Sequence, residues 1–432
     1  MSILARATSI VGGTVALMRR IGAPRTQAMG GRPEIPEARK QGLMTLKLPA
    51  AEGWKNGRLP RCAPGLKVNA FAEGLQHPRW IEVLPTGDVL VAEARPEAGP
   101  PKSLMDHAAQ VTMQRIKAVG PSANRVSLWR DADGDGVAEH REVFVENQRQ
   151  PFGMAVVGET FYLGNTDGIV AFPFPPGTTR LDESAGRRLV EFKPGGHWTR
   201  SLIVSPDGSK IYAGVGSLTN IADEGMEVEE GRAAIWELDV ASEEARIFAT
   251  GLRNAVGTAF EPSTGALWTV VNERDGLGDE TPPDYLTSVV DGGFYGWPYC
   301  YWDRIVDDRV PQDAEMVARA IKPDYALGGH TASLGLCWMP EGTLPGFGAG
   351  MVIGQHGSWN RSKLSGYKLL FVPFENGRPS ETEPPRDILS GFLSDDEKLA
   401  YGRPVGVCLG PDGKSLLMAD DVGDVIWRVT GA

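Results

Sequence analysis

The sequence predicts an all-β protein, a six-bladed β-propeller, and three observations support this fold class. Strand-like segments alternate with tight turns beyond about residue 65, a strand–turn–strand unit occurs six times, and strands at the two ends of this region suit pairing. Glycine and proline contribute 54 and 32 of the 432 residues. Such a share favours many turns and excludes a mostly helical protein.

Each repeated unit has an apolar strand, a turn of the Pro-Asp-Gly type and a second strand of alternating apolar residues. Proline presets φ at one turn position, and Asp-Gly tolerates positive φ at another. The turns lie at residues 84–88, 157–159, 205–208, 261–265, 347–350 and 410–413. Six units of roughly 60 residues leave room for four strands per blade. An open sandwich is the alternative fold, but it rarely has so long and regular a period.

Closure of a propeller requires the first and last strands to share a blade, which removes exposed edges. Leu66–Phe71 and Val425–Val429 are suitable partners. One segment, Lys102–Val119, has apolar residues at helical spacing and predicts a helical insert in blade one, with a role in packing or as a lid over a site. We therefore expect a propeller domain over residues 65–432.

The preceding residues 1–60 predict a poorly ordered leader or N-terminal extension. Ala7–Met18 is too short and too rich in Gly and Thr for a membrane span, and its flanking arginines make it a poor signal peptide. No other stretch predicts a membrane span.

Composition excludes several function classes. The net charge of −11 disfavours binding to a nucleic-acid backbone, which needs a basic face. The sequence has no Rossmann glycine motif, Walker loop or nucleophile elbow. The four cysteines form no CxxC pair, which excludes a zinc ribbon or a thioredoxin-type site. One bridge, Cys300–Cys337, stays open, since spacing alone does not decide it.

The segment Asp131–Glu142 has the spacing of a 12-residue calcium loop. Oxygen ligands fall at positions 1, 3, 5, 9 and 12, namely Asp131, Asp133, Asp135, Glu139 and Glu142. Gly136 at position 6 permits the sharp bend that such loops need. The flanks alternate like strands, so we expect a β-hairpin with a structural calcium ion rather than a helical switch. A solvated acidic turn is the alternative.

Several cations and one imidazole lie at expected strand starts. His197 follows two glycines, Arg253-Asn254 leads into an apolar strand, and Arg403 occupies a similar position two blades later. Arg361 and Lys363 lie in a glycine- and serine-rich segment. Cations that converge at a propeller axis predict a polyanionic small ligand. The alternative interpretation of each single cation is a surface ion pair. The alternative for a lone histidine such as His197 is an ordinary surface or core residue. His330 and His356, also in glycine-rich segments, are further candidates for the same channel.

Five segments together resemble the quinoprotein glucose/sorbosone dehydrogenase family, most closely its sorbosone dehydrogenase branch. They are GGHWTRSLIVSPDG, GLRNAVGTAFEPSTG, VVNERDGLGDE, DGGFYGWPY and GRPVGVCLGPDG. Their order and spacing match over about residues 65–430. The GLRN and GGFYGWP strings are rather specific, whereas the Pro-Asp-Gly turns are not.

The resemblance implies a six-bladed propeller that binds pyrroloquinoline quinone (PQQ) and calcium at the mouth of its axis. His197 matches the general base that takes the substrate hydroxyl proton, and Arg253 matches the arginine that polarises a quinone oxygen. The other matches are Asn254, Thr331 and Ser333 lining the cofactor, Arg403, Arg361 and Lys363 holding its carboxylates, and the carbonyls of Arg274 and Asp275 binding its calcium.

The chain departs from the family at three points, one of which is the Lys102–Val119 insert, so the substrate of the family does not transfer to this chain. Ser217 stands where soluble glucose dehydrogenase has an Asp that supports the base, so either another group, such as Glu229 or Asp207, orients His197, or the basicity of His197 is lower. Arg274 places a positive charge beside the expected cation.

These observations predict a PQQ-dependent dehydrogenase that oxidises an aldose, or an aldosulose such as sorbosone, to a lactone or acid. Trp80, Trp198 and Trp359 are candidates for a sugar platform. The expected partners are a sugar substrate and a quinone- or dye-type electron acceptor, in a periplasmic monomer or homodimer. Two alternatives stay open: a calcium-dependent propeller lactonase or esterase, and a non-catalytic binding propeller.

Overall fold

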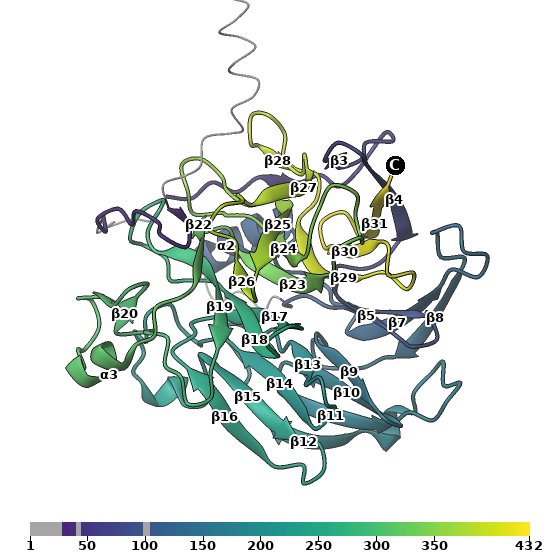
Figure 1. Ribbon diagram of the computed structural model, residues 1–432, viewed down its shortest axis with the longest axis horizontal. Helices are drawn as coiled ribbons and strands as arrows, with labels where there is room; N and C mark the ends of the chain where they lie inside the picture. Colours follow the sequence, from purple (N-terminus) through teal and green to yellow (C-terminus); the bar gives the residue numbers. More distant parts are fainter. Residues whose placement is uncertain (1–27, 40–44, 98–103) are drawn as a thin grey trace, which may run out of the picture.

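Four-stranded antiparallel sheets account for most of the chain. The computed structural model describes residues 28–39, 45–97 and 104–432. Blade one contains β5 (Pro78–Val83), β6 (Val89–Glu93), β7 (Arg125–Arg130) and β8 (His140–Val145). Blade two contains β9 (Met154–Val157), β10 (Thr160–Asn165), β11 (Gly168–Pro173) and β12 (Arg187–Glu191). Blade three contains β13 (Leu202–Val204), β14 (Lys210–Val215), β15 (Ala234–Asp239) and β16 (Ala245–Thr250). Figure 1 shows blades two and three together in the lower half of the view.

The remaining blades recruit strands from the N-terminal part of the chain. Blade four contains β17 (Ala255–Glu261), β18 (Ala266–Val271), β19 (Pro283–Val289), β22 (Tyr325–Gly329) and β1 (Met29–Gly30). Blade five contains β23 (Ser333–Met339), β24 (Gly350–Gln355), β25 (Lys368–Glu375), β27 (Arg386–Ser390) and β3 (Arg61–Cys62), with β26 (Arg378–Pro379) beside β25. Blade six contains β29 (Pro404–Leu409), β30 (Leu416–Asp420), β31 (Val425–Gly431) and β4 (Leu66–Glu73).

The first strands of the blades form a closed ring. β5 contacts β9, and the contacts continue through β13, β17, β23 and β29 back to β5. β4 pairs with β31 from Leu66 opposite Gly431 to Glu73 opposite Val425. The predicted six-bladed propeller and its closing strands are therefore confirmed.

The six repeated turns all connect the first strand of a blade to its second strand. Gly208 and Gly413 illustrate why glycine stands there, because their φ angles are +74° and +63°, a region that side chains rarely adopt. Apolar side chains of these strands pack between neighbouring blades. Phe144, Phe152 and Phe161, for example, are fully buried in the core between blades one and two.

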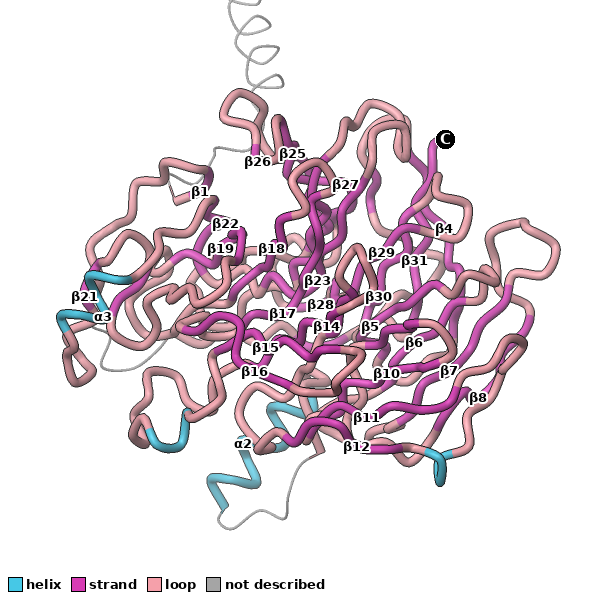
Figure 2. Tube along the Cα trace, turned by 60° about the horizontal axis from the view of Figure 1, so that its bottom comes forward, coloured by secondary structure: helices cyan, strands magenta, loops and turns pink. Residues whose placement is uncertain are grey.

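Helices are few and peripheral. The expected insert contains α2 (Leu104–Arg115), between β6 and β7 of blade one, although its residues 102 and 103 lie outside the described residues. α3 (Ala314–Arg319) lies in the long connection of blade four, which also holds the short hairpin of β20 (Cys300–Tyr301) and β21 (Ile305–Val306). Figure 2 shows both helices at the edge of the molecule. No helix within the described residues is long and apolar enough to cross a membrane.

The described part of the N-terminal extension contacts the propeller. β1 pairs with β22, and β2 (Ala50–Ala51) pairs with β28 (Leu399–Ala400). The Trp54 indole N–H donates to Asp420 at 2.7 Å. All four cysteines are free, so the optional Cys300–Cys337 bridge is not formed.

Candidate active site

A cavity of about 340 Å³ opens at one end of the ring. That volume is in the range of small-molecule and cofactor sites. Most of its lining residues lie near the beginnings of first strands or just after second strands of blades one, three, four and five, and Asp284 comes from the third strand of blade four, β19. The charged and imidazole side chains that line it are Arg79, His197, Arg253, Glu273, Asp275, Asp284, His330 and His356.

His197 lies directly before blade three and is held in one tautomer. Its Nδ1 lies 2.9 Å from the carbonyl oxygen of Ser217, so Nδ1 carries the proton and donates it. Nε2 has no partner among the described residues and remains an acceptor. Burial, followed by the charge of Arg253, lowers the pKa of His197 to about 3. The imidazole is therefore neutral at pH 7, which leaves the lone pair of Nε2 free to accept a proton.

The glycines before His197 allow this position. Gly196 has φ +56°, and a Cβ added to it would lie 2.5 Å from Leu218 Cα. The backbone of His197 can therefore lie directly on the Ser217–Leu218 segment. The buried guanidinium of Arg200 also fixes the backbone of His197, since its Nη1 donates to the His197 carbonyl at 2.9 Å.

Neither of the two carboxylates expected to orient His197, Glu229 and Asp207, bonds its imidazole, although Glu229 acts on it through the backbone. Asp207 bonds Ser205 and Ser209 within an exposed turn. Glu229 is buried and accepts the backbone N–H groups of Leu218 and Thr219 at 2.7 and 2.8 Å. The carboxylate thus holds the segment whose Ser217 carbonyl orients the imidazole. A main-chain acceptor replaces the expected acidic side chain, and sequence spacing gives no signal for such a contact.

Arg253 and Asn254 line the cavity beside His197, as predicted. The Arg253 guanidinium donates to the carbonyls of Asn220 and Glu273 at 3.1 and 2.8 Å, and its Nη2 lies 3.7 Å from Asp275. The carbonyl acceptors satisfy its N–H groups, and the Asp275 carboxylate partly balances its positive charge at the cavity wall.

Arg79 is a cavity residue that the sequence analysis did not identify. It is the second residue of β5, whereas Arg253 lies two residues before β17 of blade four. A cation near the start of a first strand is the signal that could have revealed it. The Arg79 Nη1 group pairs with buried Asp421, while its Nε is buried with no partner among the described residues.

Three predicted carboxylate-binding residues do not line the cavity. Arg403 is buried behind it, where Nε and Nη2 donate to the carbonyls of His356 and Gly357 at 3.0 and 2.8 Å. Arg361 pairs with Glu280, and Lys363 is exposed. Arg403 therefore supports the loop that carries His356, while the other two lie outside the cavity wall.

Thr331 and Ser333 are buried next to the cavity, and their neighbours Ala332 and Leu334 line it. The two hydroxyl oxygens lie 2.9 Å apart, and Thr331 also donates to Asp284. Both residues thus fix the wall in this region.

The carbonyl of Asp275, predicted to bind calcium, already accepts three hydrogen bonds. Its donors are Nε and Nη2 of Arg274 at 3.0 and 2.7 Å and the Asn220 amide at 3.1 Å. The Arg274 guanidinium also pairs with buried Asp307. A cation at this carbonyl would require Arg274 to turn away.

Carboxyl groups balance the cations of the cavity. The Asp275 carboxylate pairs with His330 at 3.3 Å. Burial raises the pKa of Glu273 to about 7, and one of its oxygens, Oε1, is buried without a partner among the described residues. Of the three candidate tryptophans, Trp198 and Trp359 line the cavity, whereas Trp80 packs on Phe152 in the core.

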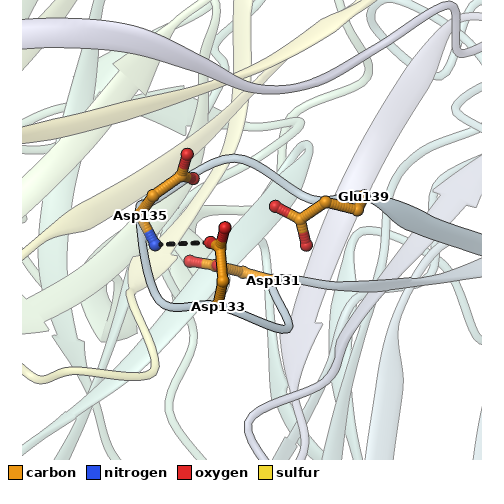
Figure 3. A group of neighbouring side chains, drawn as sticks. All are labelled: Asp131, Asp133, Asp135 and Glu139. Atoms are coloured by element: carbon orange, nitrogen blue, oxygen red, sulfur yellow. Dashed lines mark hydrogen bonds between the residues drawn. The ribbon is translucent and has the colours of Figure 1, made fainter.

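The acidic hairpin of blade one lies between β7 and β8, as predicted, and Figure 3 shows four of its carboxylates around one turn. Oxygens of Asp131, Asp133, Asp135 and Glu139 all lie within 4.8 Å of one another. Glu142 is not part of this group and is exposed on β8. The turn is anchored on the closing strand, because Ala138 N–H donates to the Phe71 carbonyl at 2.7 Å.

The cavity residues fit a flat, anionic cofactor such as PQQ. Arg79 and Arg253 supply guanidinium groups, each of which also pairs with a carboxylate, Asp421 and Asp275 respectively, and Arg79 Nε and Asn254 Oδ1 are buried polar atoms without partners among the described residues. Such groups are costly unless a ligand or water completes their hydrogen bonds. A ligand with carboxylate and N–H groups meets both needs.

Comparisons with known proteins agree with this architecture. The model of the TrAA12-like family matches residues 116–432. An uncharacterized protein of Borreliella burgdorferi is 31% identical over 238 residues, which cover 54% of this chain and 60% of that protein. The pyrroloquinoline quinone-dependent pyranose dehydrogenase of Coprinopsis cinerea is 27% identical over 299 residues, which cover 54% of this chain and 40% of that protein.

The chain thus matches less than two thirds of the length of either relative. A solved structure of the Carbohydrate-Active Enzymes Family AA12 protein from Trichoderma reesei superimposes with a TM-score of 0.71 at 21% identity. The superposition covers 91% of this chain and all of that one, which shows a shared fold. Since the family model spans most of the propeller, the chain belongs to the TrAA12-like family.

Proposed function

We propose that this protein is a PQQ-dependent dehydrogenase that oxidises a sugar. One observation carries the proposal: a neutral imidazole, His197, and a positive guanidinium, Arg253, line one cavity at the propeller axis. The name of the Coprinopsis relative, a pyrroloquinoline quinone-dependent pyranose dehydrogenase, supports the same cofactor and substrate class.

The residues of the chain have separate roles in this reaction. His197 accepts the hydroxyl proton of the sugar at Nε2, because its Nδ1–H is committed to Ser217. The anionic cofactor is held by Arg253, Arg79 and Asn254. Arg253 also stabilises the negative charge that develops beside its guanidinium. PQQ, when bound, supplies the acceptor for the hydride that leaves the sugar carbon. Trp198 and Trp359 offer flat apolar faces for a sugar ring.

The substrate is an aldose or the hydrated aldehyde of an aldosulose such as sorbosone, and the product is a lactone or an acid. A quinone- or dye-type molecule takes the electrons onward. A periplasmic location would suit these partners, and cell fractionation checks it.

The experiment is a titration of the purified apo-protein with PQQ, with and without Ca²⁺, followed by dye reduction across aldoses and aldosuloses. We expect saturable binding and dye reduction with at least one sugar. Arg253→Ala and Arg79→Ala should weaken PQQ binding at least tenfold. Arg180→Ala, on the surface and 64% exposed, is the matched control and should bind like the wild type. Absence of dye reduction with every sugar would overturn the proposal.

We further propose that the acidic hairpin binds Ca²⁺ in a structural role. Its four clustered carboxylates offer hard oxygen ligands, which calcium prefers. Since the turn bonds the closing strand β4, the ion would stabilise the junction between blades one and six.

A further inference from the structure

Three histidines line the cavity, and they differ in how many ring nitrogens are engaged. His330 uses both, since Nε2 lies 2.8 Å from the Gly278 carbonyl and Nδ1 lies 3.2 Å from the Asn360 amide. His197 uses only Nδ1. His356 uses only Nε2, which lies 2.8 Å from Asp421 Oδ2. Among the described residues nothing bonds His356 Nδ1, so two imidazoles keep a free acceptor.

The partner of His356 is a deeply buried carboxylate. The Asp421 side chain is 1% exposed and also pairs with Arg79. Because Asp421 accepts the Nε2–H of His356, the second nitrogen, Nδ1, carries the lone pair. This Asp–His arrangement is the one that fixes an imidazole as a base. His77 lies on the same carboxylate at 3.4 Å but does not line the cavity.

The backbone of His356 is fixed on both sides. Its N–H donates to the Ala332 carbonyl at 2.9 Å, and its own carbonyl accepts Arg403 Nε at 3.0 Å. Arg403, which did not reach the cavity, therefore positions this second imidazole.

The charges around His356 keep it neutral. Burial, followed by the charge of Arg403, lowers its pKa to about 4, against the opposing effect of Asp421. The other charged or titratable groups nearby are Arg79 and His77 from blade one. A neutral imidazole with a free nitrogen at the cavity wall has the lone pair that a proton acceptor needs, and its lowered pKa means that it passes the proton on rather than keeping it at pH 7.

We propose that His356, held by Asp421, is a second proton acceptor of this cavity, used when the site is returned to its oxidised state. The inference rests on the proposed function. Oxidation of a hemiacetal to a lactone removes two electrons and two protons. His197 accepts the hydroxyl proton, and the second hydrogen leaves the carbon as hydride. When a dye or quinone takes both electrons, that hydrogen leaves as a proton, and an N–H bond forms at His356 Nδ1.

The first test reads the imidazole itself and needs no cofactor. In ¹⁵N-histidine-labelled full-length apo-protein at pH 7, we expect His356 Nδ1 to be unprotonated and Nε2 protonated, with the signal assigned by its loss in His356→Gln. A proton on Nδ1 would overturn the inference.

The second test separates the two half-reactions of PQQ-loaded enzyme by stopped flow. The amide of His356→Gln can still donate to Asp421, but it lacks the basic nitrogen. We expect sugar-driven reduction within about twofold of the wild type and dye-driven reoxidation at least tenfold slower. In His356→Ala, added imidazole should restore reoxidation. His77→Gln is the matched control, because His77 contacts the same carboxylate outside the cavity, and it should reoxidise normally.

The outcomes separate the two proposals. If no sugar reduces the PQQ-loaded wild-type protein, the proposed function is overturned, and the proposed role of His356 falls with it. An active wild type whose His356→Gln variant is folded and reoxidises at the normal rate overturns only the role of His356.

Discussion

The axial cavity and the acidic hairpin are built in opposite ways. The hairpin collects its carboxylates from the short segment Asp131–Glu139, on an exposed turn whose backbone N–H groups bond the same carboxylates. The cavity collects residues from different blades, and its Arg79–Asp421 pair joins positions 342 residues apart. The hairpin residues are mostly exposed, whereas the cavity side chains are largely buried.

This difference in burial explains why the pKa values and tautomers of the histidines are controlled in the cavity and not in the hairpin. In the cavity, burial and neighbouring guanidinium groups keep His197 and His356 neutral, and acceptors fix which nitrogen carries the proton. In the exposed hairpin, water competes for the same carboxylates, and under our proposal a calcium ion would offset their mutual repulsion. Loss of one cavity residue should therefore affect chemistry, and loss of the ion should affect stability.

The largest effect is expected from His197→Ala, which tests whether the cavity carries the chemistry. Removal of the base should lower sugar-dependent reduction of PQQ by about 10²–10⁴-fold, the usual contribution of general base catalysis, while PQQ still binds. Single-turnover kinetics measure the rate. His140→Ala, an exposed histidine next to the hairpin, should leave it unchanged. A His197→Ala variant within tenfold of the wild type would contradict the role of His197.

Glu229→Ala tests whether His197 depends on the carboxylate that fixes the Ser217–Thr219 backbone beside it. We expect a reduction rate about 10–100-fold lower, because the Ser217 carbonyl would lose its fixed position, and an unfolding free energy about 1–3 kcal/mol lower, because buried amides would lose their acceptor. Kinetics and urea unfolding measure the two effects.

The control for Glu229 is Glu230→Ala. The Glu230 side chain is 82% exposed and forms an ion pair with Lys193 at 3.6 Å. It should match the wild type in both measurements. A stable Glu229→Ala variant with a wild-type rate would show that the Ser217 segment holds His197 unaided.

Calcium removal probes the other region. With free calcium tenfold above its dissociation constant, binding to the native state should add about 1.4 kcal/mol of stability. A chelator should therefore lower the melting temperature measured by calorimetry, without changing PQQ affinity at the cavity. Asp133→Asn should abolish the calcium-dependent change in the melting temperature. Identical melting curves with calcium and with chelator would contradict a calcium site in the hairpin.

The smallest expected effect is a pH dependence at His356. Its folded pKa of about 4 lies below its ordinary 6.5. As the pH falls from 7 to 6, the unfolded chain gains part of a proton that the folded protein does not, so stability falls. The contribution is below about 1 kcal/mol in this window. His356→Gln should flatten the curve from denaturant unfolding, whereas the exposed control His140→Gln should not. An unchanged slope in His356→Gln would contradict the shift.

The repeat pattern predicted much of the fold because each signal is local. The turns that precede second strands, such as the one with Gly208, need a particular backbone conformation and so mark the sequence directly. The closing pair β4 and β31 was predictable because a propeller leaves no other partner for its first strand. The fifth strands that β1 and β3 add to blades four and five carry no such signal, since each is only two residues long.

For the candidate site, the sequence determined which residue types stand at the strand starts, and this was enough to bring His197, Arg253 and Asn254 to one predicted cavity. Only the tertiary structure decided which cations reach it, since Arg79 lines the wall while Arg403 supports a loop behind it. It alone assigned the tautomers of His197 and His356, through a carbonyl 20 residues away and a carboxylate 65 residues away. The physical reason is that strand position follows from local periodicity, whereas burial and hydrogen-bond direction depend on neighbours that only the closed ring brings together.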